Sequence, residues 1–234
     1  MYGYGGYAAA SNPWSVDMVT GHNVVEWVRK GRIYVHCILR GGCEYGTAWH
    51  EAAMKDRKKN AFYDFIDTAR YLVTSGWTRA EKIVATGLSN GGLLMTAITT
   101  ISPEDFGVVV ASVPHTDMLR FREDPRGMMY ITEYGDPKGS EDMFRYMLSY
   151  SPYHNIRPDT VYPSLYVQTG EMDNNVPPYH GKKFAVRMQR EADEAHPVLL
   201  QVLAHGSHDR GVGDEYFLNI AQMQTFVEVE LAKV

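Results

Sequence analysis

The stretch KIVATGLSNGGLL at residues 82–94 decides the fold expected for this chain. It begins as a short, mostly apolar run, continues as the pattern G-x-S-x-G around Ser89, and ends as an apolar helical pattern. A strand that turns at once into a helix holds the turn residue in a cramped conformation, and Gly87 and Gly91 leave the necessary room. The pattern therefore predicts a nucleophile elbow, with the Ser89 hydroxyl at the amino end of a helix, where negative charge is favoured.

The sequence on both sides of the elbow alternates strand-like and helix-like segments. This alternation is typical of a parallel sheet covered by helices on both faces, so we expect an α/β fold in one domain over residues 1–234. Residues 115–163 have no regular pattern and are either a helical excursion that roofs a pocket or an irregular surface segment. The expected strands are residues 32–39, 82–86, 108–113, 164–169 and 198–203, and the expected helices are residues 60–75, 91–101, 179–194 and 214–231.

Composition and charge describe an ordinary globular protein. The chain has 234 residues, of which 44% are hydrophobic, enough for one core without a metal or disulfide staple. The formal net charge of −5 argues against nucleic acid or an anionic membrane as a partner. The basic block at residues 55–59 is interpreted as a solvated helix face. Two cysteines, no signal-peptide pattern and no long apolar stretch predict a reduced, cytoplasmic setting.

A serine nucleophile needs a base to take its proton and a carboxylate to orient that base. The loop after the fourth expected strand contains Glu171 and Asp173, and the loop after the fifth contains His205 and His208. The carboxyl ends of parallel strands open on one edge of the sheet, which is also the edge of the elbow. We therefore expect a carboxylate and an imidazole from these two loops to converge on Ser89.

Within each loop the position of the residue favours one candidate. Glu171 follows the strand almost directly and would bind local backbone amides, whereas Asp173 lies further around the turn. His208 is preferred over His205 because it is farther from the strand end and follows Gly206, which lets the loop bend. The spacing of the two histidines is not taken as a metal pair, since zinc sites need three or four convergent ligands. No metal or cofactor is expected.

Four short motifs, spread along nearly the whole chain, form a specific combination. They are YGYGGY at residues 2–7, RGGCEYG at 40–46, GLSNGG at 87–92 and YSPYHN at 150–155. In these motifs the chain resembles the catalytic domain of the prolyl oligopeptidase family of serine peptidases, which implies an α/β-hydrolase fold with a mostly parallel sheet. The resemblance implies Ser89, Asp173 and His208 as the catalytic triad. It adds an oxyanion hole formed by the Tyr4 hydroxyl and the backbone amide of Asn90.

The resemblance also suggests which residues would contact a peptide substrate. Prolyl-specific members place a Trp under the proline ring and an Arg two residues after the triad Asp, and the matching positions look like Tyr130 and Asn175. Tyr130 can still stack on a ring, but Asn175 lacks the charged fork of arginine. Members that cut after Lys or Arg carry acidic residues near residues 130–133, where only Glu133 is acidic here. We expect cleavage after proline or another small apolar residue, in an apolar pocket of Tyr7, Tyr130, Tyr134 and Val176.

Two parts of the usual family architecture are not found in this sequence. Family members carry a β-propeller, and their hydrolase domain has strands ahead of the motif at residues 2–7, including a central one. We therefore expect an N-terminally truncated domain: a fragment of a longer product, a natural short protein, or a chain completed by a partner. Residues 32–39 and 82–86 would then pair directly or leave a gap, and a homodimer through an exposed sheet edge is a hypothesis.

The main functional prediction is a serine peptidase that cleaves short peptides through an acyl-enzyme on Ser89, with His208 shuttling the proton. The same triad serves other acyl transfers, so an esterase or an exopeptidase is the second reading. A third reading is an inactive fragment that acts only through association, because an incomplete sheet would misplace Tyr4.

Overall fold

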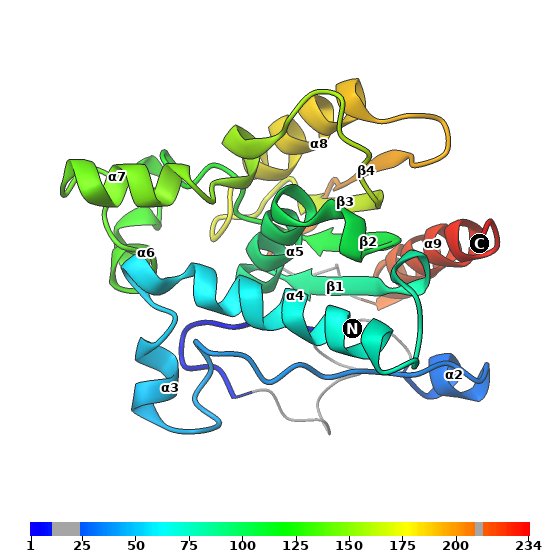
Figure 1. The fold of residues 1–234 in the computed structure, drawn as a ribbon. Coiled ribbons are helices and arrows are strands. Elements are labelled where there is room, and N and C mark those ends of the chain that lie inside the picture. Colours follow the sequence, from blue (N-terminus) through cyan, green and yellow to red (C-terminus); the bar gives the residue numbers. More distant parts are fainter. Residues whose placement is uncertain (11–23, 209–212) are drawn as a thin grey trace.

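The computed structural model describes residues 1–10, 24–208 and 213–234. Its centre is a parallel sheet of four strands in the order β1-β2-β3-β4 (Figure 1). Val84 lies opposite Val108, which in turn lies opposite Ser164, so the three strands start in register. Both central strands are buried throughout, as the continuous apolar run at residues 108–113 predicts for β2. The strands are β1 (Val84–Leu88), β2 (Val108–Ser112), β3 (Ser164–Gly170) and β4 (Val198–Leu203).

Helices cover both faces of the sheet, with α4, α5 and α8 on one face and α9 on the other (Figure 1). Buried side chains recur along α4 at the spacing of one helix face, as in Phe62, Phe65 and Ile66. On the opposite face, Phe226 of α9 packs on Tyr166 of β3. The predicted fold class is therefore confirmed. The bounds are α4 (Lys59–Thr74), α5 (Asn90–Ile101), α8 (Tyr179–Glu191) and α9 (Gly213–Leu231).

The connection between β2 and β3 is helical, which decides between the two alternatives that its sequence left open. It contains α6 (Gly127–Tyr134) and α7 (Glu141–Leu148), with the short 3-10 turns η5 (Phe121–Glu123) and η6 (Pro152–Asn155). The Ser140 hydroxyl caps α7 by accepting the N–H of Met143 at 3.1 Å. The remaining short elements are α2 (Val24–Arg29), α3 (Thr47–Glu51), η2 (Lys55–Arg57), η3 (Ala80–Lys82) and η4 (Pro103–Asp105).

The prediction of a strand over residues 32–39 is wrong. Instead of a ladder, this segment makes one isolated bridge, to Tyr2. Residues 1–3 lie between the segment and β1 and bond to both: the N–H of Tyr2 donates to the Val35 carbonyl at 2.9 Å, and the N–H of Gly3 donates to β1. Three residues offer too little backbone for a ladder, and they keep the two expected strands from pairing directly.

The predicted gap is present in part. Next to Met1, a cavity of about 370 Å³ lies between segment 32–39 and the start of β1. The Met1 amino group lies at this cavity and donates to the Val84 carbonyl at 2.6 Å. The cavity walls are mainly apolar and include Ile33, Val35, Leu72, Ile83 and Leu231.

Two surface features bear on possible partners. Among the described residues β4 is an edge strand, and its Leu199 and Val202 are 46% and 40% exposed. The homodimer through a sheet edge stays a prediction. Within the described ranges, no helix is long and apolar enough to cross a membrane.

The elbow glycines have no room for a side chain. A Cβ on Gly87 would lie 2.4 Å from the carbonyl oxygen of Gly91, and a Cβ on Gly91 would lie 2.6 Å from that of Gly3. These are backbone atoms, which cannot rotate out of the way. The space that the sequence assigned to Gly87 and Gly91 is therefore required.

We expect Gly87→Ala to lower the free energy of unfolding by about 2–3 kcal/mol, because the added methyl group overpacks a rigid backbone crossing. Urea denaturation measures this change. Gly139→Ala is the control, since its Cβ would meet its nearest neighbour at 3.2 Å on an exposed turn. Equal stability losses in the two variants would contradict this account.

Candidate active site

Ser89 occupies a strained turn between β1 and α5. Its φ of 60° and ψ of −115° lie in a region that costs a non-glycine residue about 1–3 kcal/mol. Hydrogen bonds on both sides hold it there: its N–H donates to the Ser112 carbonyl at 2.9 Å, and its own carbonyl accepts the N–H of Leu93 at 3.0 Å. The turn thus places the hydroxyl at the amino end of α5, as the pattern predicts.

Three side chains from separate loops form one hydrogen-bonded chain. The Nε2 atom of His208 lies 2.8 Å from the Ser89 Oγ, although the two residues are 119 positions apart. The Nδ1 atom of His208 lies 2.8 Å from the Asp173 Oδ2. The three loops follow β1, β3 and β4, so the parallel sheet brings together the side chains that the sequence predicts to converge.

The turn around Asp173 fixes the direction of its carboxylate. The side chain is fully buried, and its Oδ1 accepts the N–H groups of Asn175 and Val176, both at 2.8 Å. The other oxygen is left for His208. The rejected alternatives lie elsewhere: Glu171 pairs with Lys182 at 2.5 Å on the surface, and His205 is exposed.

Tyr4 lies beside the serine, and its hydroxyl hydrogen-bonds to the Ser89 side chain. Burial, together with nearby groups such as Glu133, raises the pKa of Tyr4 to about 12, so the phenol keeps its proton and can donate it. Asn90 begins α5, where backbone N–H groups have no intrahelical partner. Its side-chain amide donates to the Tyr4 carbonyl at 2.5 Å and accepts from the Tyr134 hydroxyl at 3.1 Å.

The aromatic residues expected around a substrate lie together. Tyr7, Tyr130 and Tyr134 are arranged edge to face, with ring centroids 5.7 to 6.3 Å apart. The Tyr130 hydroxyl donates to the backbone carbonyl of Asn175 at 3.0 Å. Tyr134 and Val176 are buried, whereas Tyr7 and Tyr130 are partly exposed. The accessible aromatic surface of the cluster is thus that of Tyr7 and Tyr130.

His115 extends this aromatic cluster and was missed in the sequence. Its ring packs edge to face on Tyr130 and Tyr134, with centroids 5.2 and 5.6 Å away. Burial, and to a smaller extent the neighbouring side chains of His180, His208 and Lys58, lowers the pKa of His115 well below its usual value, so the ring is neutral. No motif surrounds His115, so only its place after β2 connects it with the site.

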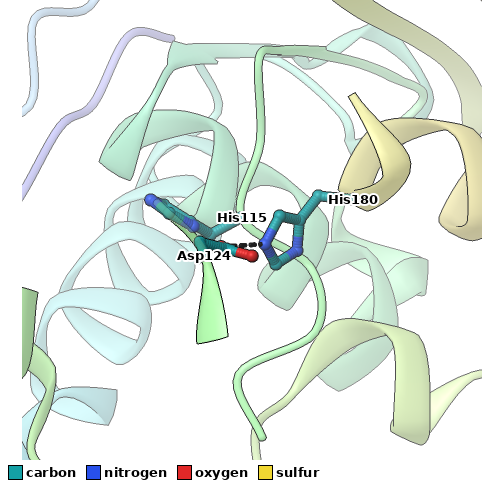
Figure 2. A group of neighbouring side chains, drawn as sticks. All are labelled: His115, Asp124 and His180. Carbon is teal, nitrogen blue, oxygen red and sulfur yellow. Dashed lines mark hydrogen bonds and ion pairs between the residues drawn. The ribbon is translucent and has the colours of Figure 1, made fainter. Parts of the chain in front are cut away.

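A second group missed in the sequence is formed by His115, Asp124 and His180, whose polar atoms lie within 4.8 Å of one another (Figure 2). The Nδ1 of His180 accepts the backbone N–H groups of Thr116 and Asp117 at 3.2 and 3.1 Å. Its proton is therefore on Nε2, which donates to Asp124 at 2.9 Å. A metal bound at Nε2 would force a proton onto Nδ1, against two N–H groups. The arrangement favours a hydrogen-bonded network over a metal site.

Comparisons with known proteins agree with this geometry. The model of the prolyl oligopeptidase family matches residues 18–233. The prolyl endopeptidase of Elizabethkingia miricola is 37% identical over 217 residues, which are 92% of this chain and 30% of that protein. The prolyl endopeptidase of Dictyostelium discoideum is 38% identical over 216 residues, which are 91% of this chain and 28% of that protein.

A solved structure has a similar fold over nearly the whole chain. The post-proline cleaving enzyme from Rickettsia typhi is similar with a TM-score of 0.89 at 27% identity, over 99% of this chain and 33% of that one. The chain thus spans about a third or less of the length of these relatives. From its family match, its sequence identity and its fold, the chain belongs to the prolyl oligopeptidase family.

Proposed function

We propose that this chain hydrolyses peptide bonds through an acyl-enzyme on Ser89, and that it cleaves after proline. The observation that carries the proposal is the continuous hydrogen-bonded chain from the Ser89 hydroxyl through His208 to Asp173, with 2.8 Å at each step. A serine held in this way has a base within reach and a carboxylate that fixes the base.

The proposed reaction follows the direction of these hydrogen bonds. The Ser89 hydroxyl donates to the His208 Nε2, so attack of Oγ on the scissile carbonyl transfers the proton to the imidazole. His208 then gives that proton to the leaving amine. Asp173 accepts a hydrogen bond from the Nδ1–H and stabilises the imidazolium, and its two backbone hydrogen bonds keep it aligned. A water molecule, activated by His208 in the same way, releases the acyl group.

The tetrahedral intermediate would be stabilised by two donors. The Tyr4 hydroxyl is already hydrogen-bonded to Ser89, so it lies close to the atom that attacks. The Asn90 backbone N–H lies at the start of α5, where the helix dipole also favours negative charge. Donors of this kind are worth about 3 kcal/mol each in the transition state.

The proposed preference for proline rests on the aromatic cluster and on the names of the relatives, which are prolyl endopeptidases. Tyr7 and Tyr130 offer partly exposed rings on which a pyrrolidine ring can pack. Glu133, the acidic residue near this cluster, is bound to Lys58 and His50 at 2.9 Å each. Its charge is therefore neutralised inside the protein and does not attract a basic substrate.

A fluorophosphonate probe is expected to label Ser89. Ser89→Ala should abolish labelling, and His208→Ala should slow it at least ~10³-fold, because the serine loses its base. His205→Ala is the matched control, since His205 is an exposed histidine outside the hydrogen-bonded chain, and it should label at the wild-type rate. Gel fluorescence against time gives the rates. Labelling that survives in Ser89→Ala would rule out this nucleophile.

Tyr4→Phe keeps the ring and removes only the hydroxyl. We expect kcat on a blocked prolyl peptide to fall by about 10²–10³ with little change in KM, because the lost donor acts mainly in the transition state. Tyr45→Phe, at a side chain that is 70% exposed, should leave both constants unchanged. An unchanged kcat in Tyr4→Phe would exclude the hydroxyl from the oxyanion hole.

Blocked peptides that differ only in the residue before the scissile bond test the substrate preference. We expect kcat/KM to be on the order of 10²-fold higher for proline than for lysine, because a lysine ammonium would lose its water of hydration against the rings of Tyr7 and Tyr130. A p-nitrophenyl ester serves as a second substrate. Turnover of the ester without turnover of any peptide would favour the esterase reading and contradict the proposal.

A further inference from the structure

Lys58 is a buried lysine behind the loop of residues 4–8, which carries Tyr4 and Tyr7. Its side chain has no exposed surface. The interpretation of residues 55–59 as a solvated helix face is therefore wrong for Lys58. Its ammonium points inward at the start of α4, where it finds acceptors inside the protein. A buried lysine is rare unless its charge is paired, so its contacts need a reason.

The Lys58 ammonium joins two parts of the candidate site. It donates to the Gly5 carbonyl at 3.0 Å and to the Glu133 Oε1 at 2.9 Å. It also lies 5.3 Å from the centroid of the Tyr134 ring. Gly5 belongs to the loop that carries Tyr4, and Glu133 belongs to α6. One cation therefore links the loop of residues 4–8 to α6, the helix that supplies Tyr130 and Tyr134 to the aromatic cluster.

The Glu133 carboxylate completes the link from the other side. Its side chain is 3% exposed, and its second oxygen lies 2.9 Å from the His50 Nε2. The carboxylate also accepts the backbone N–H of Tyr7. The ion pair thus binds the loop twice, through the carbonyl of Gly5 and through the amide of Tyr7.

The loop needs such anchors because its backbone is strained. Gly5, Tyr7 and Ala8 have φ values of 62°, 58° and 51°, which non-glycine residues seldom adopt. Strain of this kind persists only where the surroundings impose it. The contact is close: a Cβ on Gly6 would lie 2.8 Å from the Lys58 Nζ.

We propose that Lys58 and Glu133 are positioning residues, whose buried ion pair holds the loop of residues 4–8 so that Tyr4 and Tyr7 meet the same substrate. The inference rests on the proposed hydrolase function. Gly5 is the residue after Tyr4, so the hydrogen bond from Lys58 to the Gly5 carbonyl governs the placement of the Tyr4 hydroxyl. The amide of Tyr7 governs the placement of the exposed aromatic ring.

The test compares Lys58→Met with Lys59→Met. Both variants remove one positive charge at the start of α4, but the Lys59 ammonium binds the exposed Ser149 hydroxyl at 3.1 Å, away from the loop. We expect fluorophosphonate acylation and kcat on a blocked prolyl peptide to fall at least tenfold in Lys58→Met. Lys59→Met should match the wild type. A wild type that does not react contradicts the proposed function, whereas a reactive wild type with equal rates in both variants contradicts the positioning role.

A double variant separates positioning from mere stability. Lys58→Met/Glu133→Gln also removes the carboxylate charge that Lys58→Met leaves buried without its lysine. We expect its melting temperature to recover toward the wild type while its acylation stays at least tenfold slow, because the Gly5 carbonyl still lacks its donor. Recovery of stability and acylation together would overturn the proposal.

Glu133→Asp decides the question if Lys58→Met does not fold. This variant keeps both charges but shortens the reach of the carboxylate toward the Tyr7 amide by one methylene group. We expect a rise in KM for the prolyl peptide with a smaller effect on a p-nitrophenyl acetate substrate, whose acyl group is too small to use the Tyr7 ring. Wild-type constants for both substrates would overturn the proposal.

Discussion

The candidate site depends on a close crossing of backbones at Gly3, Gly87 and Gly91. The Gly3 carbonyl oxygen lies 2.6 Å from the place of a Cβ on Gly91 and 3.0 Å from that of a Cβ on Gly87. Residues 1–3 also hydrogen-bond to β1, so the chain leaves this crossing with Tyr4 beside Ser89. The elbow and the loop of residues 4–8 are therefore one packed unit, and a side chain at the crossing would move Tyr4 away from Ser89.

The parallel sheet supplies the rest of the hydrogen-bonded chain by a different route. Asp173 and His208 belong to loops after neighbouring strands, and strand direction alone brings these loops to the edge where Ser89 lies. Local turn chemistry then selects the atom: two backbone amides occupy one oxygen of Asp173 and leave the other for the imidazole. The strand order thus brings the loops of Asp173 and His208 near Ser89. The hydrogen bonds within the turn then fix the direction of the Asp173 carboxylate.

The difference between contacts set by strand order or local pattern and contacts set by distant segments explains what the sequence could predict. The elbow, the four strands of the sheet and the convergence of Asp173 and His208 follow from local periodicity and from a topological rule. The position of Tyr4 beside Ser89 depends on a backbone crossing between distant segments. Sequence spacing therefore could not predict it, and only the resemblance to the family did. Lys58 lies in a basic run whose pattern is that of a solvated face, and its partner is 75 residues away in a connection without periodicity. Residues 32–39 failed as a strand because strand formation needs a partner, which no local pattern reveals.

The chemistry of the Lys58–Glu133 pair indicates why a charged pair suits this position. Apolar residues of similar volume often give equal or greater stability than a buried ion pair, although removal of one charge costs about 3–5 kcal/mol. Apolar residues, however, have no donor for the Gly5 carbonyl and no acceptor for the Tyr7 amide, both of which the pair satisfies. Within the pair, the Lys58 ammonium also compensates the negative charge of Glu133. The burial of one lysine therefore does two things: it anchors the loop of residues 4–8, and it compensates the charge of Glu133 beside the aromatic cluster.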